Sequence, residues 1–134
     1  MRKIKFRGAP VFGKGFVYGF INQYKEGFKL KYEIITMENG VTRYEIKPES
    51  IGEFTGLKDK NSKKIYEGDI IIGCEVFGST KMIVKYDEEH AYFYPFGTGD
   101  YSESFLMEEV EVIGNIFENP ELLKSGDERG ATPS

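Results

Sequence analysis

The sequence has few of the residues on which catalytic and metal sites usually depend. Its 134 residues include one cysteine, Cys74, and one histidine, His90. A single cysteine cannot close a disulfide within the chain, so nothing indicates an oxidising compartment. The sequence shows no zinc-type spacing of Cys and His, and His90 is the only histidine base that a Ser or Cys nucleophile could use. We therefore expect no cofactor and no catalytic residues.

Long apolar runs are also missing. No stretch approaches the 18 or more apolar residues that a membrane helix requires. The first seven residues alternate basic and apolar side chains and lack the apolar core of a signal peptide. These absences predict a cytoplasmic protein with no membrane partner.

Aromatic residues and glycine are plentiful. Aromatics make up 15% of the chain, with nine Tyr and eleven Phe, and there are 16 glycines. This balance favours strands and tight turns over helices. A chain of this length that is 40% hydrophobic suits one domain with one core. We expect an all-β domain over residues 1–123 and a disordered tail over residues 124–134, where apolar residues become scarce.

Charge is unevenly distributed along the chain. Residues 1–66 contain 14 Lys/Arg and 7 Asp/Glu, a net +7, whereas residues 67–134 contain 4 and 15, a net −11. This split is consistent with a basic face for a polyanion, with two regions that meet within or between subunits, or with an ordinary solvated surface.

Alternating apolar residues and turn residues predict a series of short strands. Ile4 and Phe6 should share a core face opposite a basic face, and so should Phe28, Leu30, Tyr32 and Ile34. The run 16–21 should be covered on both faces, with Gly19 at a bulge or close backbone approach. Asn39-Gly40 predicts a hairpin turn. The expected strands cover residues 3–7, 16–21, 28–35, 41–46, 51–55, 70–76, 81–86, 91–94 and 110–117, and short helical turns residues 104–109 and 119–123, the latter capped by Asn119.

The stretch 51–71 combines a strand, a polar turn and a second apolar run. Asp59 and Asn61 can accept hydrogen bonds from the backbone of that turn, and Thr55-Gly56 and Glu67-Gly-Asp69 are typical of corners. Asp69 should accept backbone amide hydrogens at its corner, which is a structural role.

Two segments of this stretch, Thr55-Gly-Leu-Lys-Asp-Lys-Asn61 and Ile65-Tyr-Glu-Gly-Asp-Ile70, resemble the central motif of the YopX family of phage and prophage proteins. Residues 4–8, 17–19 and 111–122 agree with the family in order and spacing. The sequence departs from it at Phe16, where Trp is commoner, and at Ser62, where Gly is usual, so that turn must form without an easy positive φ. The motif residues are Thr55, Gly56, Leu57, Asp59, Asn61, Tyr66, Glu67, Gly68, Asp69, Gly114 and Asn115.

The resemblance implies a small β-barrel related to SH3-type barrels and an accessory role in phage, without a defined activity. Other chemistry has weaker support. Asp87, Glu88 and Glu89 beside His90 could hold a hard cation, but a solvated hairpin tip explains them more simply. Asp59 to Asn61 opens like a calcium loop, which Lys63 and Lys64 contradict. Glu67 and Asp69 could form an acid/base pair, but a turn explains them better. We therefore expect no metal site.

The leading hypothesis is a non-enzymatic accessory protein that binds a host or phage protein and forms a homo-oligomer. The alternative is a small barrel that binds nucleic acid through aromatic and basic residues of the first half, although the pI near 5.2 argues against it. A metal- or nucleotide-dependent enzyme is a minor alternative. The aromatics are Phe6, Phe16, Tyr18, Tyr24, Tyr32 and Tyr44, and the candidate polyanion-binding residues are Lys58, Lys60, Lys63, Lys64, Arg2, Lys3, Lys5 and Arg7.

Overall fold

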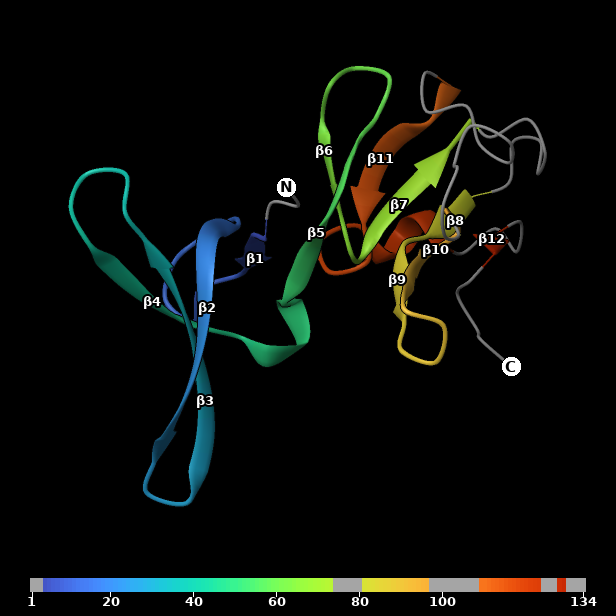
Figure 1. Cartoon of the computed structure of the whole chain (residues 1–134). Helices are drawn as coiled ribbons and strands as arrows, with labels where there is room; N and C mark the ends of the chain where they lie inside the picture. The colour runs from blue at the N-terminus through green and yellow to red at the C-terminus, as the bar shows by residue number, and fades with distance from the viewer. Residues whose placement is uncertain (1–3, 74–80, 97–108, 124–127, 130–134) are drawn as a thin grey trace. The chain divides into compact units, whose positions relative to one another are not determined.

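The chain is mostly β-structure, as predicted (Figure 1). The computed structural model describes residues 4–73, 81–96, 109–123 and 128–129. Contacts divide the chain into two compact units, residues 1–54 and 55–134, and the boundary falls inside β5 (Gly52–Lys58). Closure into an SH3-like barrel and a single domain over residues 1–123 stay predictions. In the described part of the chain, no helix has the length and apolar character needed to cross a membrane.

Unit 1 is an antiparallel sheet in the order β4-β3-β2-β1, with the start of β5 beside β1. Phe20 of β2 lies opposite Ile35 of β3, and Tyr32 of β3 lies opposite Ile46 of β4. The predicted hairpin at Asn39-Gly40 is confirmed, since β3 and β4 pair on either side of it. The elements are β1 (Phe6–Gly8), β2 (Val17–Glu26), β3 (Lys29–Thr36), β4 (Thr42–Ile46) and the 3₁₀ helix η1 (Pro48–Ser50).

One face of this sheet forms the core of unit 1. Ile34 and Ile46 are fully buried there, and Gly8 packs against both, leaving no room for a side chain of its own. Gly19 approaches the neighbouring strand closely, as predicted. A Cβ atom on Gly19 would lie 2.2 Å from the Ile35 carbonyl oxygen.

Several predicted core positions of unit 1 are wrong. The run 16–21 is covered on one face only, because Tyr18 and Phe20 project from the other face and are exposed. Phe28 and Leu30 are exposed because β2 and β3 continue past their neighbouring strands. Ile4 is exposed, before β1 begins at Phe6, whereas Arg7, expected on a solvated basic face, is buried.

Unit 2 contains the rest of β5 and a sheet in the order β11-β7-β8-β12, with a separate β9–β10 hairpin. The hairpin at residues 87–90 was predicted correctly. The predicted strand 81–86 is divided at Val84, whose amide donates to the Asp69 carbonyl and whose own carbonyl accepts from Gly68. The elements are β6 (Lys64–Tyr66), β7 (Asp69–Ile72), β8 (Lys81–Ile83), β9 (Lys85–Asp87), β10 (Tyr92–Tyr94), β11 (Glu111–Asn115), η5 (Pro120–Leu123) and β12 (Glu128–Arg129).

The core of unit 2 draws residues from β6, β7, β8, β10 and β11 and from the segments between strands. Leu57 packs at its edge, and the buried members are Ile65, Ile71, Met82, Val84, Phe93, Phe96, Val110 and Val112. Every member comes from after the boundary in β5, so unit 2 has a core of its own.

The C-terminal predictions fare differently. The helical turn at 119–123 is confirmed as η5. The Asn119 Oδ1 accepts a hydrogen bond from the Asn115 amide, and the cap expected at Asn119 stays a prediction. Glu128–Arg129, expected in a disordered tail, pair in parallel with β8. Cys74, the turn at residues 104–108 and the rest of the tail lie outside the described residues.

Candidate functional site

The polar turn of the motif, residues 58–64, is held to the last long strand by Asp59. Asp59 Oδ1 accepts hydrogen bonds from the amides of Asn61 at 2.8 Å and Lys63 at 2.9 Å. Its Oδ2 accepts from the Val112 amide of β11 at 3.0 Å. The local bonds agree with the predicted turn, but the bond to Val112 spans 53 residues and could not be read from the sequence.

The surroundings of Asp59 favour its ionised form. The carboxylate is buried, and burial alone would raise its pKa. Bonds from the amides of Val112, Lys63 and Asn61, with the nearby Lys63 ammonium, outweigh that effect, so the pKa of Asp59 is lowered. Asp59 therefore stabilises the turn as an ionised carboxylate, and hydrogen bonds from three backbone amides stabilise its negative charge.

Other motif residues also bond to backbone. Asp69 accepts from the Tyr66 amide at 2.8 Å, as predicted, and Thr55 Oγ1 donates to the Ile65 carbonyl at 2.8 Å. Asn115 Oδ1 accepts from the amides of Phe117 and Glu118. Glu67 is half-buried beside the Gly68 corner. The Asp69 and Asn115 bonds hold turns, and the Thr55 bond joins β5 to β6. The structural role of the motif stays a prediction.

Backbone conformation explains two glycines and one departure from the family pattern. Gly56 and Gly68 have φ of 90° and 96°, which glycine adopts without strain. Gly56 lies inside β5 and not at the predicted corner. Ser62 has φ of 65°, so the turn adopts the left-handed conformation despite lacking glycine there, contrary to the expectation for this position.

The two predicted basic clusters fall in different units. Lys58, Lys60 and Lys63 are exposed on the turn, Lys64 is half-buried, and Lys60 Nζ lies 3.3 Å from Glu111 Oε1. In unit 1, Lys5 Nζ lies 5.9 Å from the centre of the Tyr18 ring, and the Arg7 guanidinium lies 4.4 Å from the Phe16 ring. Arg2 and Lys3 are outside the described residues.

His90 and its acidic neighbours form a turn. Asp87 Oδ1 accepts from the amides of Glu89 and His90, and Asp87 Oδ2 lies 3.0 Å from His90 Nδ1. The hydrogen bond with His90 lowers the pKa of Asp87. Among the described residues, no group of three or more His, Cys, Asp or Glu side chains is arranged to hold a metal ion.

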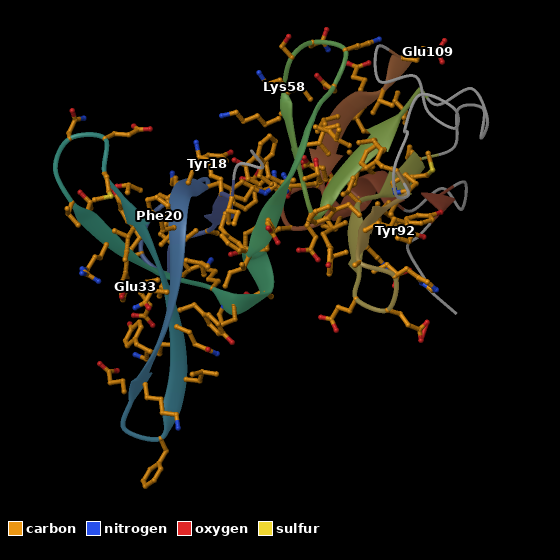
Figure 2. All side chains as sticks on the ribbon, viewed as in Figure 1. Tyr18, Phe20, Glu33, Lys58, Tyr92 and Glu109 are labelled. Carbon is orange, nitrogen blue, oxygen red and sulfur yellow. The ribbon has the colours of Figure 1, made fainter. Side chains whose placement is uncertain are left out.

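An exposed aromatic surface lies on unit 1, on the face of the sheet opposite its core. We call it the Tyr18 face. Tyr18 and Phe20 are 43% and 58% exposed, and Figure 2 labels both on β2, with Glu33 on β3. Alternation along β2 and the β2–β3 register place seven side chains on this face: Tyr18, Phe20, Asn22, Tyr24, Ile35, Glu33 and Lys31.

Charged groups of β2, β3 and β4 beside the Tyr18 face pair with one another, while Lys5 lies over the Tyr18 ring. Glu33 Oε2 accepts from Asn22 Nδ2 at 2.8 Å and from Arg43 Nη1 at 3.2 Å. Lys31 Nζ lies 2.6 Å from Glu26 Oε1 and 3.5 Å from Glu45 Oε2. The bond with Lys31 lowers the pKa of Glu26 and raises that of Lys31. The face thus offers aromatic rings framed by ion pairs, with little net charge.

Sequence reasoning found part of this surface. Tyr18 and Tyr24 were among the proposed binding aromatics, but Phe20 was assigned to a buried strand. The signal was present, because aromatic residues recur at positions 16, 18, 20 and 24, which lie on one side of a strand.

Comparisons with known proteins agree on a family and a fold. A family model described as "YopX protein" matches residues 14–124. No curated protein matches the chain. Among solved structures, protein EF1440 from Enterococcus faecalis is similar, with a TM-score of 0.57 and 21% identity over 92% of this chain and 100% of that one. At this identity, the similarity concerns the fold alone.

Proposed function

Because the chain belongs to the YopX family, we propose that it is a phage- or prophage-encoded accessory protein without enzymatic activity. It acts by binding a host or phage protein, and it self-associates. The observation that carries the proposal is the exposure of Tyr18 and Phe20 on an ordered sheet. Tyr, Phe and Arg are enriched at protein interfaces, and exposed apolar patches commonly mark binding sites.

Two further features support binding over catalysis. The motif carboxylates Asp59 and Asp69 are buried and accept backbone amides, so they are engaged in holding turns. On the Tyr18 face, the pairing of Arg43 with Glu33 leaves a nearly neutral rim around the aromatics. A neutral rim suits a protein partner better than a polyanion, which requires excess positive charge.

Native mass spectrometry of the protein purified gently from its host tests the proposal. We expect a retained protein, and we expect Phe20→Ser to reduce its amount because an interface ring is lost. Phe12→Ser is the matched control, since Phe12 is 86% exposed in unit 1 but lies outside the Tyr18 face. Equal retention by the Phe20 and Phe12 variants would contradict the role of this face.

Nucleic-acid binding is the second candidate, favoured by one observation. Tyr18 and Phe16 each lie next to a cation, Lys5 and Arg7, as in surfaces on which bases stack. This function predicts that single-stranded DNA binds with an affinity that falls steeply with salt. Reversing the charges of Lys58, Lys60 and Lys63 should weaken that binding without unfolding the protein. An affinity that does not fall with salt would contradict nucleic-acid binding. An unchanged affinity in the triple variant would show that the turn is not the binding site.

A further inference from the structure

The β2–β3 hairpin extends beyond the rest of the unit 1 sheet. On β2, β1 pairs only with Val17, Tyr18 and Gly19, and β4 pairs with β3 only from Tyr32 onward. The β2–β3 ladder itself continues to Glu26 and Lys29. Residues 24–31 therefore form a two-stranded arm, which Figure 1 shows projecting from the unit 1 sheet.

A tight turn at the end of this arm presents a bare aromatic ring. Gly27 has φ of 66° and Phe28 has no positive φ, which is the φ pattern of a two-residue type II′ turn. Phe28 is 108% exposed, so its ring makes almost no contact with its own molecule. A rigid turn presents such a ring at little entropic cost on binding, which is a property of interface anchors.

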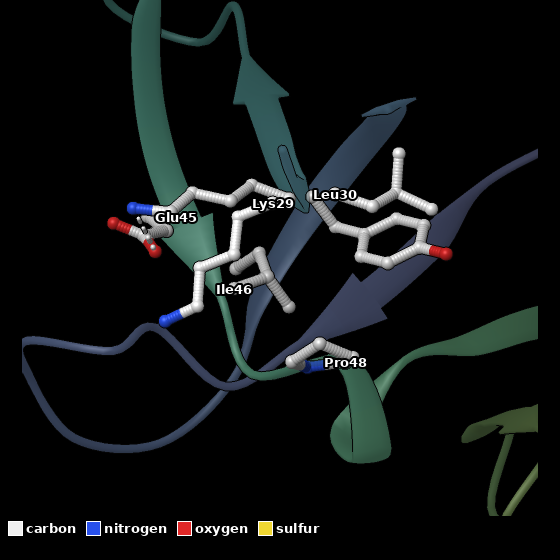
Figure 3. Close-up of a pocket in the computed structure, with 7 residues that line it drawn as sticks. Lys29, Leu30, Glu45, Ile46 and Pro48 are labelled. Atoms are coloured by element: carbon white, nitrogen blue, oxygen red, sulfur yellow. Dashed lines mark ion pairs between the residues drawn. The ribbon is translucent and has the colours of Figure 1, made fainter. Parts of the chain in front are cut away.

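A pocket lies at the base of the same arm. Its volume is about 170 Å³, and Figure 3 shows Leu30, Ile46, Pro48 and Glu45 around it; Tyr32 also lines it. An aliphatic cavity of about 150 Å³ in another protein binds benzene. The pocket is therefore large enough for one aromatic ring. Its rim carries the Glu45 carboxylate and the side chains of Lys29 and Lys31.

The spacing of ring and pocket suits a second copy of this chain. Phe28 lies two residues before Leu30 and four before Tyr32 on one strand. The free edge of β3 ends at Lys31, because Tyr32 already pairs with Ile46 of β4. If two arms instead pack with the faces that carry Leu30 and Tyr32 together, antiparallel about a twofold axis at Leu30, residue 28 of each lies across from residue 32 of the other. Each Phe28 then reaches its partner's pocket, which it does not fill in its own molecule.

Charge at the arm agrees with this arrangement. Lys25 and Lys29 flank the tip, and neither forms an ion pair among the described residues of unit 1. Glu45 at the pocket rim is 36% exposed and lies 3.5 Å from Lys31, which Glu26 holds more closely. A tip lysine of one copy can therefore meet the Glu45 carboxylate of the other.

We propose that two copies associate through their arms, with Phe28 of each chain seated in the pocket formed by Leu30, Tyr32, Ile46 and Pro48 of the other. The inference rests on the self-association included in the proposed function and gives it a site. The Tyr18 face remains available to a different partner, because the arm tip and pocket do not include Tyr18 or Phe20.

Sedimentation equilibrium from micromolar to several hundred micromolar protein tests the inference. We expect a reversible dimer whose dissociation constant rises at least tenfold in Phe28→Ser, because both buried rings are lost together. Phe12→Ser, which removes another exposed ring of unit 1, should dimerise like the wild type. Circular dichroism checks that both variants remain folded.

The absence of tryptophan from the chain supplies a second measurement. In Phe28→Trp, the single indole should emit at shorter wavelength as protein concentration rises, whereas in Phe12→Trp the emission should not move. A dimer that Phe28→Ser leaves intact would overturn the arm site but not self-association. A wild type that stays monomeric throughout would overturn self-association, while binding of another protein at the Tyr18 face would still be decided by the Phe20 variant.

Discussion

At the scale of single residues, Asp59 carries more of the structure than its position in a polar turn suggests. Its two carboxylate oxygens bond to three amides, two within the turn and one on β11. Asp59→Ala leaves those amides without their acceptor and should lower the free energy of unfolding by about 1–3 kcal/mol. Urea unfolding measures the loss. Asp87→Ala, which removes a similar cap from an exposed turn, should cost less, and an equal loss would contradict the importance of the β11 bond.

The same carboxylate should make stability depend on pH. The pKa of Asp59 is lower in the folded protein than its ordinary value of 3.8. Its contribution is therefore complete above the pKa of the unfolded chain and is lost as the pH falls through the folded pKa. We expect the stability difference between wild type and Asp59→Ala to shrink on acidification below about pH 4. A difference that stays constant down to pH 2 would show that the carboxylate charge contributes nothing.

Ser62 gives a prediction of opposite sign. Its φ of 65° is strained for a side chain with a Cβ atom, by roughly 1 kcal/mol. Ser62→Gly removes this strain from the folded state. Glycine also increases the conformational entropy of the unfolded chain, which offsets part of the stabilisation. We expect a net stabilisation of a few tenths of a kcal/mol, measured as a raised urea midpoint. Asn61→Gly, at a neighbouring residue without positive φ, should lower the midpoint.

For single residues, the sequence predicts a hydrogen bond correctly where both partners lie within a few residues of each other. Asp69 accepts an amide three residues away, within the range that turn statistics describe, and it was predicted correctly. The bond between Asp59 and Val112 depends on where β11 lies, which no nearby residue encodes. Arg7 was misplaced for a related reason, because its burial depends on the Phe16 ring.

At the scale of elements, Gly19 fixes how closely β2 and β3 approach. Its φ is not positive, so the cost of a side chain there is steric, with a Cβ atom 2.2 Å from the Ile35 carbonyl oxygen. Gly19→Ala should destabilise the protein by about 1–3 kcal/mol. Gln23→Ala, at an exposed position of the same strand, should change it by less than about 0.5 kcal/mol. Urea unfolding of the pair decides whether the close approach matters.

The strands were predicted better than their faces. Asn39-Gly40 and the glycine at position 19 are local signals, and both were interpreted correctly. Phe28 and Leu30 alternate as core residues do, yet they are exposed, because no strand lies beside the arm to cover them. Alternation reports which residues share a face and not whether that face is covered.

At the scale of the molecule, the two units carry net charges of opposite sign, although the basic turn 58–64 lies in the acidic unit. Residues 1–54 contain 10 Lys/Arg and 6 Asp/Glu, a net +4, and residues 55–134 contain 8 and 16, a net −8. The core of unit 2 is made entirely of its own residues. We therefore expect a fragment of residues 55–134 to unfold cooperatively on heating, as followed by circular dichroism. A fragment without a thermal transition would support a single domain over residues 1–123.

The bond from Asp59 to Val112 also has a consequence for the order of events on the ribosome. Unit 1 is compact within the first 54 residues, so we expect it to fold while the rest of the chain is still being synthesised. The motif turn cannot be completed at that stage, because the Asp59 carboxylate accepts a hydrogen bond from the amide of Val112, which is synthesised 53 residues later. A nascent chain that stalls before β11 would thus carry a finished arm and an unfinished motif, open to chaperones and proteases until translation nears its end.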